Sequence, residues 1–307
     1  MHGGPGFPSF ILDYRSYFTH FTKKGGFPVP NFRIAEHDLF DYNKGFLYRY
    51  NDQVSKLTVC ARVRKPGYEL ADGCREFTRK GEAGNEEKLP ENIRRAKSKV
   101  FELALCNDFA YFCTLTFSQE KVKDRYDLES CMKSFAKWLN NYNYRKAAAS
   151  VQYLLIPEPH QDGAWHLHGL VSGIPEADLR QFQLDEHLPA HIRKELAKGH
   201  QVFQWTAYDK KFGYCTLSPI RSTDAVSKYI TKYVTKELGS SVKELNAHLY
   251  YRSQGLKQKE LIYSAPDVVL PDPDYTGTYS KIKNATAPEQ LLHYFTLEEQ
   301  EVDYDAS

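Results

Sequence analysis

Two histidines separated by one residue, His166 and His168, lie in a segment whose residue types are suited to binding a metal ion. The segment predicts a β-hairpin: an apolar run, 151–156, is followed by an Asp-Gly turn at 161–164 and a return strand, 165–171. Side chains alternate along a strand, so both imidazoles face the same side of the sheet. Neighbouring imidazoles on a rigid sheet can chelate one divalent ion.

The third ligand has two candidates, Glu158 and His160, which have the parity needed to lie opposite the histidines in a tight hairpin. Two histidines and one carboxylate with open positions are typical of a catalytic metal site, and Zn²⁺ also accepts this set. The alternative is that His166 and His168 are half-exposed polar residues on a solvent face without a ligand.

A second set of reactive side chains is a pair of tyrosines one helical turn apart, Tyr229 and Tyr233. Each is followed three residues later by a lysine, Lys232 or Lys236. Phenols flanked by cations suit a nucleophile that attacks an anionic substrate. The alternative is amphipathic packing, in which the rings cover a sheet edge and the lysines are solvated.

The element that carries the tyrosines is predicted to be a helix over 222–239. Its N-cap is one of three residues, Ser222, Thr223 or Asp224, and Gly239 stands where a helix would end. The apolar positions repeat at i, i+4 and i+8 and define the buried face: Val226, Ile230 and Val234.

Together these segments resemble a known family. His166-Leu-His168 resembles the metal motif of the HUH endonucleases, and the 229–233 segment resembles the catalytic helix of rolling-circle replication initiators of the two-tyrosine type, found in single-stranded DNA phages and related plasmids. The upstream strand 112–117 resembles the first motif of that family and carries Thr114 and Thr116. The three motifs occur in the order of the family, over about 110–238.

The resemblance implies an enzyme that nicks and rejoins single-stranded DNA at a replication origin. Glu158, His166 and His168 are expected to hold Mg²⁺ or Mn²⁺, while Tyr229 or Tyr233, with equal claims to the first attack, forms a 5′-phosphotyrosine adduct. Lysines 232 and 236 are candidates to stabilise the phenolate or the phosphate.

The elements around these motifs predict an α+β fold. Helical periodicity is present at 90–106 and 126–144, strands are expected at 112–117, 201–206 and 214–218, and the charged segment 175–199 is expected to be helical. A β-α-β-β order suits an antiparallel sheet with helices on one face. The resemblance implies the same architecture, the ferredoxin-like palm of the HUH family.

Candidate DNA contacts lie near the motifs. The 90–106 helix is basic, and phosphate contacts supply affinity that depends on salt without reading sequence. The candidates are Arg94, Arg95, Lys97, Lys99, Thr114, Thr116 and Lys228. Solvation of a helix face is the competing explanation for each single charge.

Composition sets limits on the remaining possibilities. The 307 residues are 41% hydrophobic and 26% charged, which supports a sizeable core. The net charge of +2 means that a nucleic-acid surface must be local. No apolar run is long enough to span a bilayer, and the six cysteines form no Cys-x-x-Cys pair, so we expect reduced thiols and a cytoplasmic location in the host of a phage or plasmid, without a membrane partner.

Three regions are expected along the chain. Residues 1–89 form an extension with short strands near 46–50 and 56–63, residues 90–260 form the endonuclease domain, and residues 261–307 form an irregular acidic arm. No phosphate-binding loop of the Walker type occurs in the sequence, so a host helicase and a host polymerase are the expected partners.

Two other functions fit parts of the sequence. An HUH relaxase or transposase would share the chemistry, although relaxases usually show a third histidine near the pair and single-tyrosine transposases lack the second tyrosine. A non-catalytic DNA-binding protein would use the histidines and tyrosines for packing alone.

Overall fold

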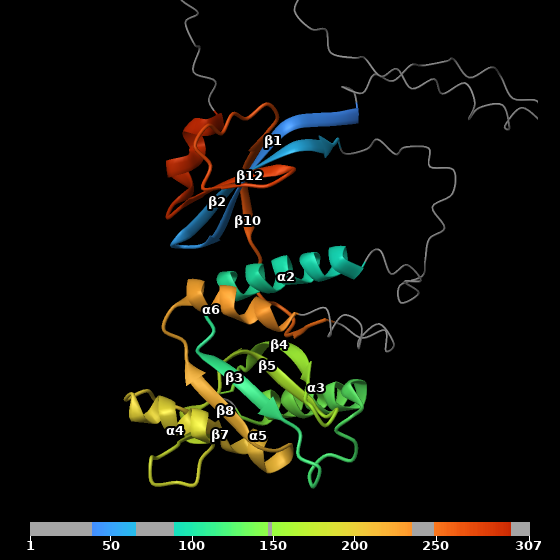
Figure 1. Cartoon of the computed structure of the whole chain (residues 1–307), viewed down its shortest axis with the longest axis vertical. Coiled ribbons are helices and arrows are strands. Elements are labelled where there is room, and N and C mark those ends of the chain that lie inside the picture. Colours follow the sequence, from blue (N-terminus) through green and yellow to red (C-terminus); the bar gives the residue numbers. More distant parts are fainter. Residues whose placement is uncertain (1–38, 66–88, 147–148, 235–248, 296–307) are drawn as a thin grey trace, which may run out of the picture.

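The structure, a computed structural model, describes residues 39–65, 89–146, 149–234 and 249–295. These residues form two antiparallel sheets with helices between and around them (Figure 1). The predicted α+β class is confirmed. Within the described residues no helix combines the length and the apolar character that crossing a bilayer requires.

The larger sheet has seven strands and carries the predicted motifs. In spatial order they are β6 (Leu179–Gln181), β7 (Phe203–Trp205), β8 (Cys215–Pro219), β3 (Tyr111–Thr116), β5 (Trp165–Ser172), β4 (Gln152–Pro159) and β9 (Tyr251–Arg252). The strand that carries the histidines is therefore flanked on both sides by predicted strands, and every pair is antiparallel.

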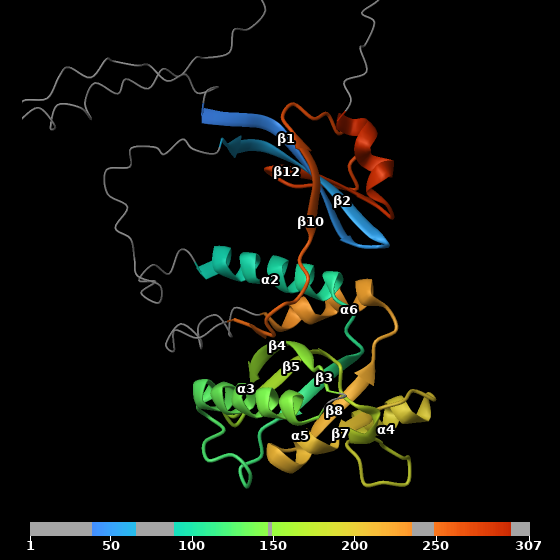
Figure 2. The same cartoon turned by 180° about the vertical axis from the view of Figure 1, so that it is seen from behind.

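Helices cover both faces of this sheet, so the prediction of helices on one face is wrong. On one face α3 (Leu128–Arg145) packs Phe135 against Tyr153, and α5 (Thr206–Lys211) follows β7. On the other face lie α2 (Leu89–Cys106) and α6 (Thr223–Ile230), which run side by side in both views (Figures 1 and 2). Strands with apolar residues on both faces, such as the fully buried Leu154 and Leu155 of β4, need cover on both sides.

The segment 175–199 is less helical than predicted. It contains a short 3-10 turn, η3 (Glu176–Asp178), then strand β6, and only then a helix, α4 (Ala190–Ala197). Its apolar residues form a small core of their own: Phe182, Leu188, Ile192, Leu196 and Val202.

The smaller sheet joins the two ends of the chain. Its order is β10 (Glu260–Ala265), β1 (Phe40–Asn51), β2 (Val54–Arg64), β12 (Ser280–Ala285) and β11 (Tyr275–Thr276), and η5 (Pro288–Phe295) packs on it. The prediction of an irregular C-terminal arm is therefore wrong for residues 261–295. Its strands complete the sheet that the N-terminal hairpin begins, and a two-stranded hairpin alone is marginally stable in water.

The two sheets meet through α2. The side-chain amide of Asn51, at the tip of the β1–β2 hairpin, donates to the carbonyl of Leu105 near the end of this helix, at 2.8 Å. The opposite side of α2 packs its apolar stripe, which includes Val100 and Leu103, into the core of the seven-stranded sheet. The helix predicted at 90–106 is thus confirmed, and it separates the two sheets.

Candidate active site

The β4–β5 hairpin places the histidines as the alternation of the sequence predicts. Glu158 pairs with His166 across the hairpin and Ile156 with His168. The turn places Gly163 at a φ of +84°, a conformation that side chains other than glycine rarely adopt. Both imidazoles and the carboxylate consequently lie on the face of the sheet that α6 covers.

His168 is held by two polar neighbours. Its Nε2 lies 2.6 Å from a carboxylate oxygen of Glu158, and its Nδ1 lies 3.2 Å from the hydroxyl of Thr114 on β3. Burial lowers the pKa of His168 to about 4, with a further contribution from Lys232. The ring is therefore neutral at pH 7: Nε2–H donates to the carboxylate, and Nδ1 accepts from the threonine hydroxyl.

His166 has different neighbours. Its ring stacks on that of His160, with centroids 4.8 Å apart and planes at 11°. His160 is in turn oriented by Asp162, which lies 3.1 Å from its Nδ1 and also pairs with Arg125 at 2.7 Å. Burial lowers the pKa of His166, and His160 contributes to the shift, so this ring is also neutral at pH 7.

These contacts allow a test of the expected metal site. In chemical type the donors fit a divalent cation, because two neutral imidazoles and a carboxylate share one face of adjacent strands. In arrangement they form two pairs, Glu158 with His168 and His160 with His166. Within the described part of the chain no three His, Cys, Asp or Glu side chains converge as a metal ion requires. The choice between Glu158 and His160 as third ligand stays open.

The tyrosine helix begins as the sequence predicts and ends differently. Ser222 is the N-cap, and its hydroxyl accepts from the amide of Ala225 at 3.2 Å. After Ile230 the chain tightens into a 3-10 turn, η4 (Thr231–Tyr233). Ile230 and Val234 are fully buried, whereas the first residue of the predicted stripe, Val226, is half-buried. Residues 235–239, which include the candidate Lys236, lie outside the described residues.

The two tyrosine hydroxyls meet above His168. They are 3.2 Å apart, and the ring of Tyr233 stacks on the imidazole of His168 with centroids 4.3 Å apart and planes at 9°. The ammonium of Lys232 lies 3.6 Å from the ring centroid of Tyr229 and 4.9 Å from that of Tyr233. Tyr229 is 46% exposed, so its hydroxyl is open to a substrate.

The surroundings separate the pKa values of the two phenols. Burial raises that of Tyr229, but Lys232 and the hydroxyl of Tyr233 outweigh burial, so the net pKa lies below the usual value. Burial and the hydrogen bond to Tyr229 raise the pKa of Tyr233. Tyr233 is thus the donor in the pair, and Tyr229 is the phenol that ionises first.

One residue of the site was missed in the sequence. Phe112 contacts both tyrosines, edge-on to Tyr229 at 5.4 Å and stacked with Tyr233 at 6.1 Å, and it also faces His168 at 6.4 Å. The signal was its parity with Thr114 on the first motif strand, which places both side chains under the tyrosine helix.

The predicted DNA contacts fall into three groups. Thr114 and Thr116 lie in the site, where Thr116 pairs with His166 across the strands. Arg94, Arg95 and Lys97 are exposed on α2, the helix beside α6. Two other lysines are paired with carboxylates of their own helices, Lys99 with Glu102 at 2.5 Å and Lys228 with Asp224 at 2.7 Å.

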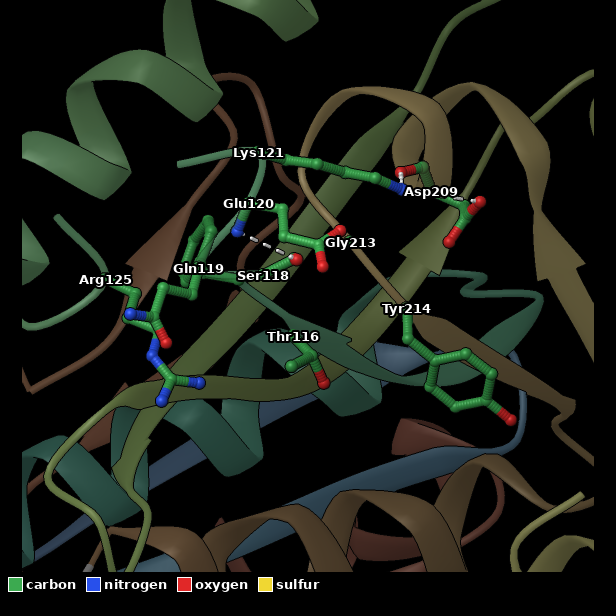
Figure 3. A pocket seen from close by; sticks show the side chains of 10 residues that line it. Thr116, Ser118, Gln119, Glu120, Lys121, Arg125, Asp209, Gly213 and Tyr214 are labelled. Carbon is green, nitrogen blue, oxygen red and sulfur yellow. Dashed lines mark hydrogen bonds and ion pairs between the residues drawn. The ribbon is translucent and has the colours of Figure 1, made fainter. Parts of the chain in front are cut away.

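A shallow depression continues from the site past Thr116 (Figure 3). Its lining includes the exposed ring of Tyr214 and the loop after β3, with Gln119, Lys121 and Arg125. Gly213 makes this closure possible, because a Cβ there would lie 2.7 Å from the amide nitrogen of Ser118. Lys121 and Arg125 are bound to acidic residues, Asp209 and Asp162, so the depression has no excess of positive charge.

Comparison with known families connects this site to DNA replication. Residues 110–238, less than half of the chain, match the family described as replication-associated protein ORF2. The matched range contains β3, the histidine hairpin and both tyrosines, and the match supports a replication initiator family. Neither the search of curated proteins nor that of solved structures gave a match.

Proposed function

We propose that this protein initiates rolling-circle replication by nicking single-stranded DNA at an origin, with a tyrosine as the nucleophile, and rejoins the strand afterwards. The observation that supports this most directly is the contact between the tyrosine pair and the histidine hairpin, in which Tyr233 stacks on His168 and its hydroxyl reaches that of Tyr229. A nucleophile, a cation and polar donors on a rigid sheet are the parts that phosphoryl transfer requires.

In the proposed reaction Tyr229 attacks first, because it is the more exposed phenol and Lys232 lies against its ring. Its phenolate oxygen forms a bond to the phosphorus, and the bond from phosphorus to the 3′ oxygen breaks. The leaving oxygen takes up a proton and becomes a free 3′-OH, from which a host polymerase extends. Rejoining is the reverse reaction, in which the 3′-OH attacks the phosphotyrosine.

We propose that Glu158, His166 and His168 hold Mg²⁺ or Mn²⁺ when the DNA is bound. The ion would polarise the scissile phosphate and offset the charge that develops on it. The residues are prepared for this role in one respect: both imidazoles are kept neutral by burial, the protonation state that a ligand needs. Binding would require the hydrogen bond from His168 to Glu158 to open and His166 to turn away from His160.

The second tyrosine has a separate proposed task. While Tyr229 carries the 5′ end, Tyr233 is the free nucleophile for a second cut after one round of replication. Their hydroxyls, 3.2 Å apart, can reach the same phosphate position without a movement of the helix. Single-stranded origin DNA, a host helicase and a host polymerase are the proposed partners, in the cytoplasm of the host cell.

The test is a covalent-adduct assay with labelled single-stranded origin DNA, with Mn²⁺ or with EDTA. We expect a protein–DNA band that survives denaturation, needs the metal and is lost in the Tyr229→Phe/Tyr233→Phe double variant. Tyr229→Phe alone should slow the first cut more than Tyr233→Phe does. Tyr144→Phe, on an exposed tyrosine at the end of α3, is the matched control.

A second candidate, a DNA-binding protein without catalysis, is favoured by one observation: the metal-ligand types form two separate pairs. If the DNA binds tightly and no adduct forms with any divalent metal, this second function replaces the first.

A further inference from the structure

The five-stranded sheet has one face that carries aromatic rings and cations in alternation. We call it the aromatic face and define it by the even-numbered residues of β1 and the cations that contact them: Phe40, Tyr42, Lys44, Phe46, Tyr48, Tyr50, Lys56, Arg62 and Lys259. Five of the six even positions from 40 to 50 are aromatic. None of these residues lies in the range that matches the replication-associated family.

The aromatic face is not the side on which this sheet builds its core. The odd-numbered residues do that: Leu47 and Leu57 are fully buried, together with Val268, Leu270 and Leu291 from the C-terminal segment. On the aromatic face the described contacts with α2 are at the hairpin end, where Lys56 lies over the ring of Phe101 at 4.3 Å. Phe40 and Phe46, further along β1, stay half-buried.

Each ring of the series is paired with a cation. Arg62 lies 3.6 Å from the ring centroid of Phe40, Lys259 lies 4.1 Å from that of Tyr48, and Lys44 lies 5.8 Å from that of Phe46. The rings of Phe46 and Tyr48 stack with centroids 6.1 Å apart. Two of the cations also contact carboxylates, Lys44 with Asp41 at 2.6 Å and Lys259 with Glu102 at 3.7 Å.

The face extends across the sheet to a fully accessible ring. Phe46 pairs with Thr58, Thr58 with Ile282 and Ile282 with Tyr275, so these four side chains form one row on the same face. Tyr275 is 60% exposed at the edge of the sheet. Three strand spacings separate it from Phe46, about 14 Å, which leaves room for more than one nucleobase between them.

We propose that the aromatic face binds single-stranded DNA as a second site, separate from the tyrosine–histidine site. Rings on a sheet stack with unpaired bases of any sequence, and the cations between them pair with the phosphates that link those bases. Double-stranded DNA cannot use the rings, because its bases are stacked and paired inside the helix. A base that stacks on Tyr48 or Phe46 displaces a lysine, whose ammonium is then beside the neighbouring phosphate.

The choice of ligand rests on the rings and cations themselves and does not depend on the nicking reaction. The probe is a fluorescein-labelled oligothymidylate of about 30 nucleotides, long enough to cover an aromatic sheet face. Binding to the full chain is measured by fluorescence anisotropy in EDTA, so that no cleavage occurs. The variants are Phe46→Leu and Tyr275→Leu, which keep an apolar side chain and remove the ring.

We expect Phe46→Leu to weaken binding of the oligothymidylate about tenfold and Tyr275→Leu about fivefold. The matched control is Tyr263→Leu: Tyr263 is 49% exposed on the same sheet but pairs with Leu47, on the opposite face, and should leave the affinity unchanged. Binding of a duplex of equal length should not change in any variant. Adduct formation on a short, saturating origin oligonucleotide should also keep its wild-type rate.

Three results would overturn the proposal. The first is unchanged affinity in both variants. The second is an equal loss for duplex and single strand, which would mean that only phosphates are contacted. The third is a lower melting temperature with unchanged affinity, which would mean that the chain itself covers this face. Because Tyr275 is exposed at an edge, its variant should fold normally and keep the test valid if Phe46→Leu does not. Failure of adduct formation in the wild type would count against the nicking function alone.

Discussion

The two sheets of this protein place aromatic rings in different company. On the seven-stranded sheet, the ring of Tyr233 lies on a neutral imidazole that is hydrogen-bonded to Glu158 and Thr114. On the five-stranded sheet, the rings lie against ammonium and guanidinium groups, as Phe40 does against Arg62. The first arrangement offers a nucleophile beside potential metal ligands. The second offers stacking and charge, and we infer that it holds a strand without reacting with it.

The difference follows from what each strand places on its face. β5 carries His166 and His168 with one residue between them, whereas β1 carries rings at the same spacing. In both cases the alternation of the strand selects the residues, and the neighbouring strand supplies their partners. Variants on one sheet should therefore leave the behaviour of the other unchanged, and the following predictions test that separation.

The largest expected effect is that of His168→Ala on adduct formation. Loss of a ligand and of the ring beneath Tyr233 should reduce the rate about a thousandfold, equivalent to about 4 kcal/mol. Binding of an oligothymidylate in EDTA should change less than twofold, and Mn²⁺ should raise the melting temperature of the wild type but not of the variant. His187→Ala, on an exposed histidine outside the sheet, is the control. A wild-type rate in His168→Ala would remove the distinction between the two sheets.

A smaller effect is expected for Thr114→Val, which keeps the shape of the side chain and removes the hydroxyl that contacts His168. Partners that orient a metal ligand typically contribute 10- to 100-fold, so the adduct rate should fall by about that factor. Thr216→Val, directly opposite on β8, is the matched control and should stay near the wild-type rate. Equal losses in both variants would indicate a general disturbance of the strands.

Much of this site could be predicted from the sequence because its order is local. The spacing of His166 and His168 fixed their common face, and the residue types at 222–224 placed the start of the tyrosine helix. The side-chain partners could not be predicted in the same way. Stacking of His166 on His160, rather than approach to Glu158, depends on rotamers that the pattern of the chain does not determine.

The smaller sheet was not predicted for a different reason. β1 pairs with β10, and β2 pairs with β12, across most of the length of the chain. Turn residues specify a hairpin such as β1–β2, but nothing local specifies which distant strand joins its edge. The C-terminal strands also carry mixed polar residues, as Lys281 and Lys283 in β12 show, so their alternation is weak.

An intermediate effect on stability alone is expected for Asp178→Asn. This carboxylate accepts hydrogen bonds from Tyr142 and Lys146 at the end of α3. Burial raises its pKa, but the hydrogen bonds from Lys146 and Tyr142 outweigh burial, so the net pKa is lowered. Because the folded state holds the charged form more tightly, the stabilisation is present at neutral pH and is lost as the pH falls below the usual value for aspartate, about 4.

The measured quantity is the free energy of unfolding in urea at several pH values. We expect Asp178→Asn to lower it by about 1–3 kcal/mol at pH 7 and by less near pH 3. The adduct rate under folded conditions should stay near that of the wild type, which separates loss of stability from loss of chemistry on the same sheet. A destabilisation that is independent of pH would show that the charge of Asp178 is not what stabilises this corner.

The smallest effects compare one cation from each surface. Lys228 on α6 forms an exposed i,i+4 pair with Asp224, so Lys228→Gln should change the free energy of unfolding by no more than about 0.5 kcal/mol. If the lysine contacts a phosphate, the dependence of the logarithm of single-strand affinity on that of salt concentration should weaken by about 0.7. Arg62→Gln on the aromatic face should weaken it by a similar amount. When one long strand occupies both surfaces, the double variant sums the two changes, to about 1.4. A double variant no different from either single variant would mean that the strand occupies one surface at a time, and the two sheets would then compete for DNA.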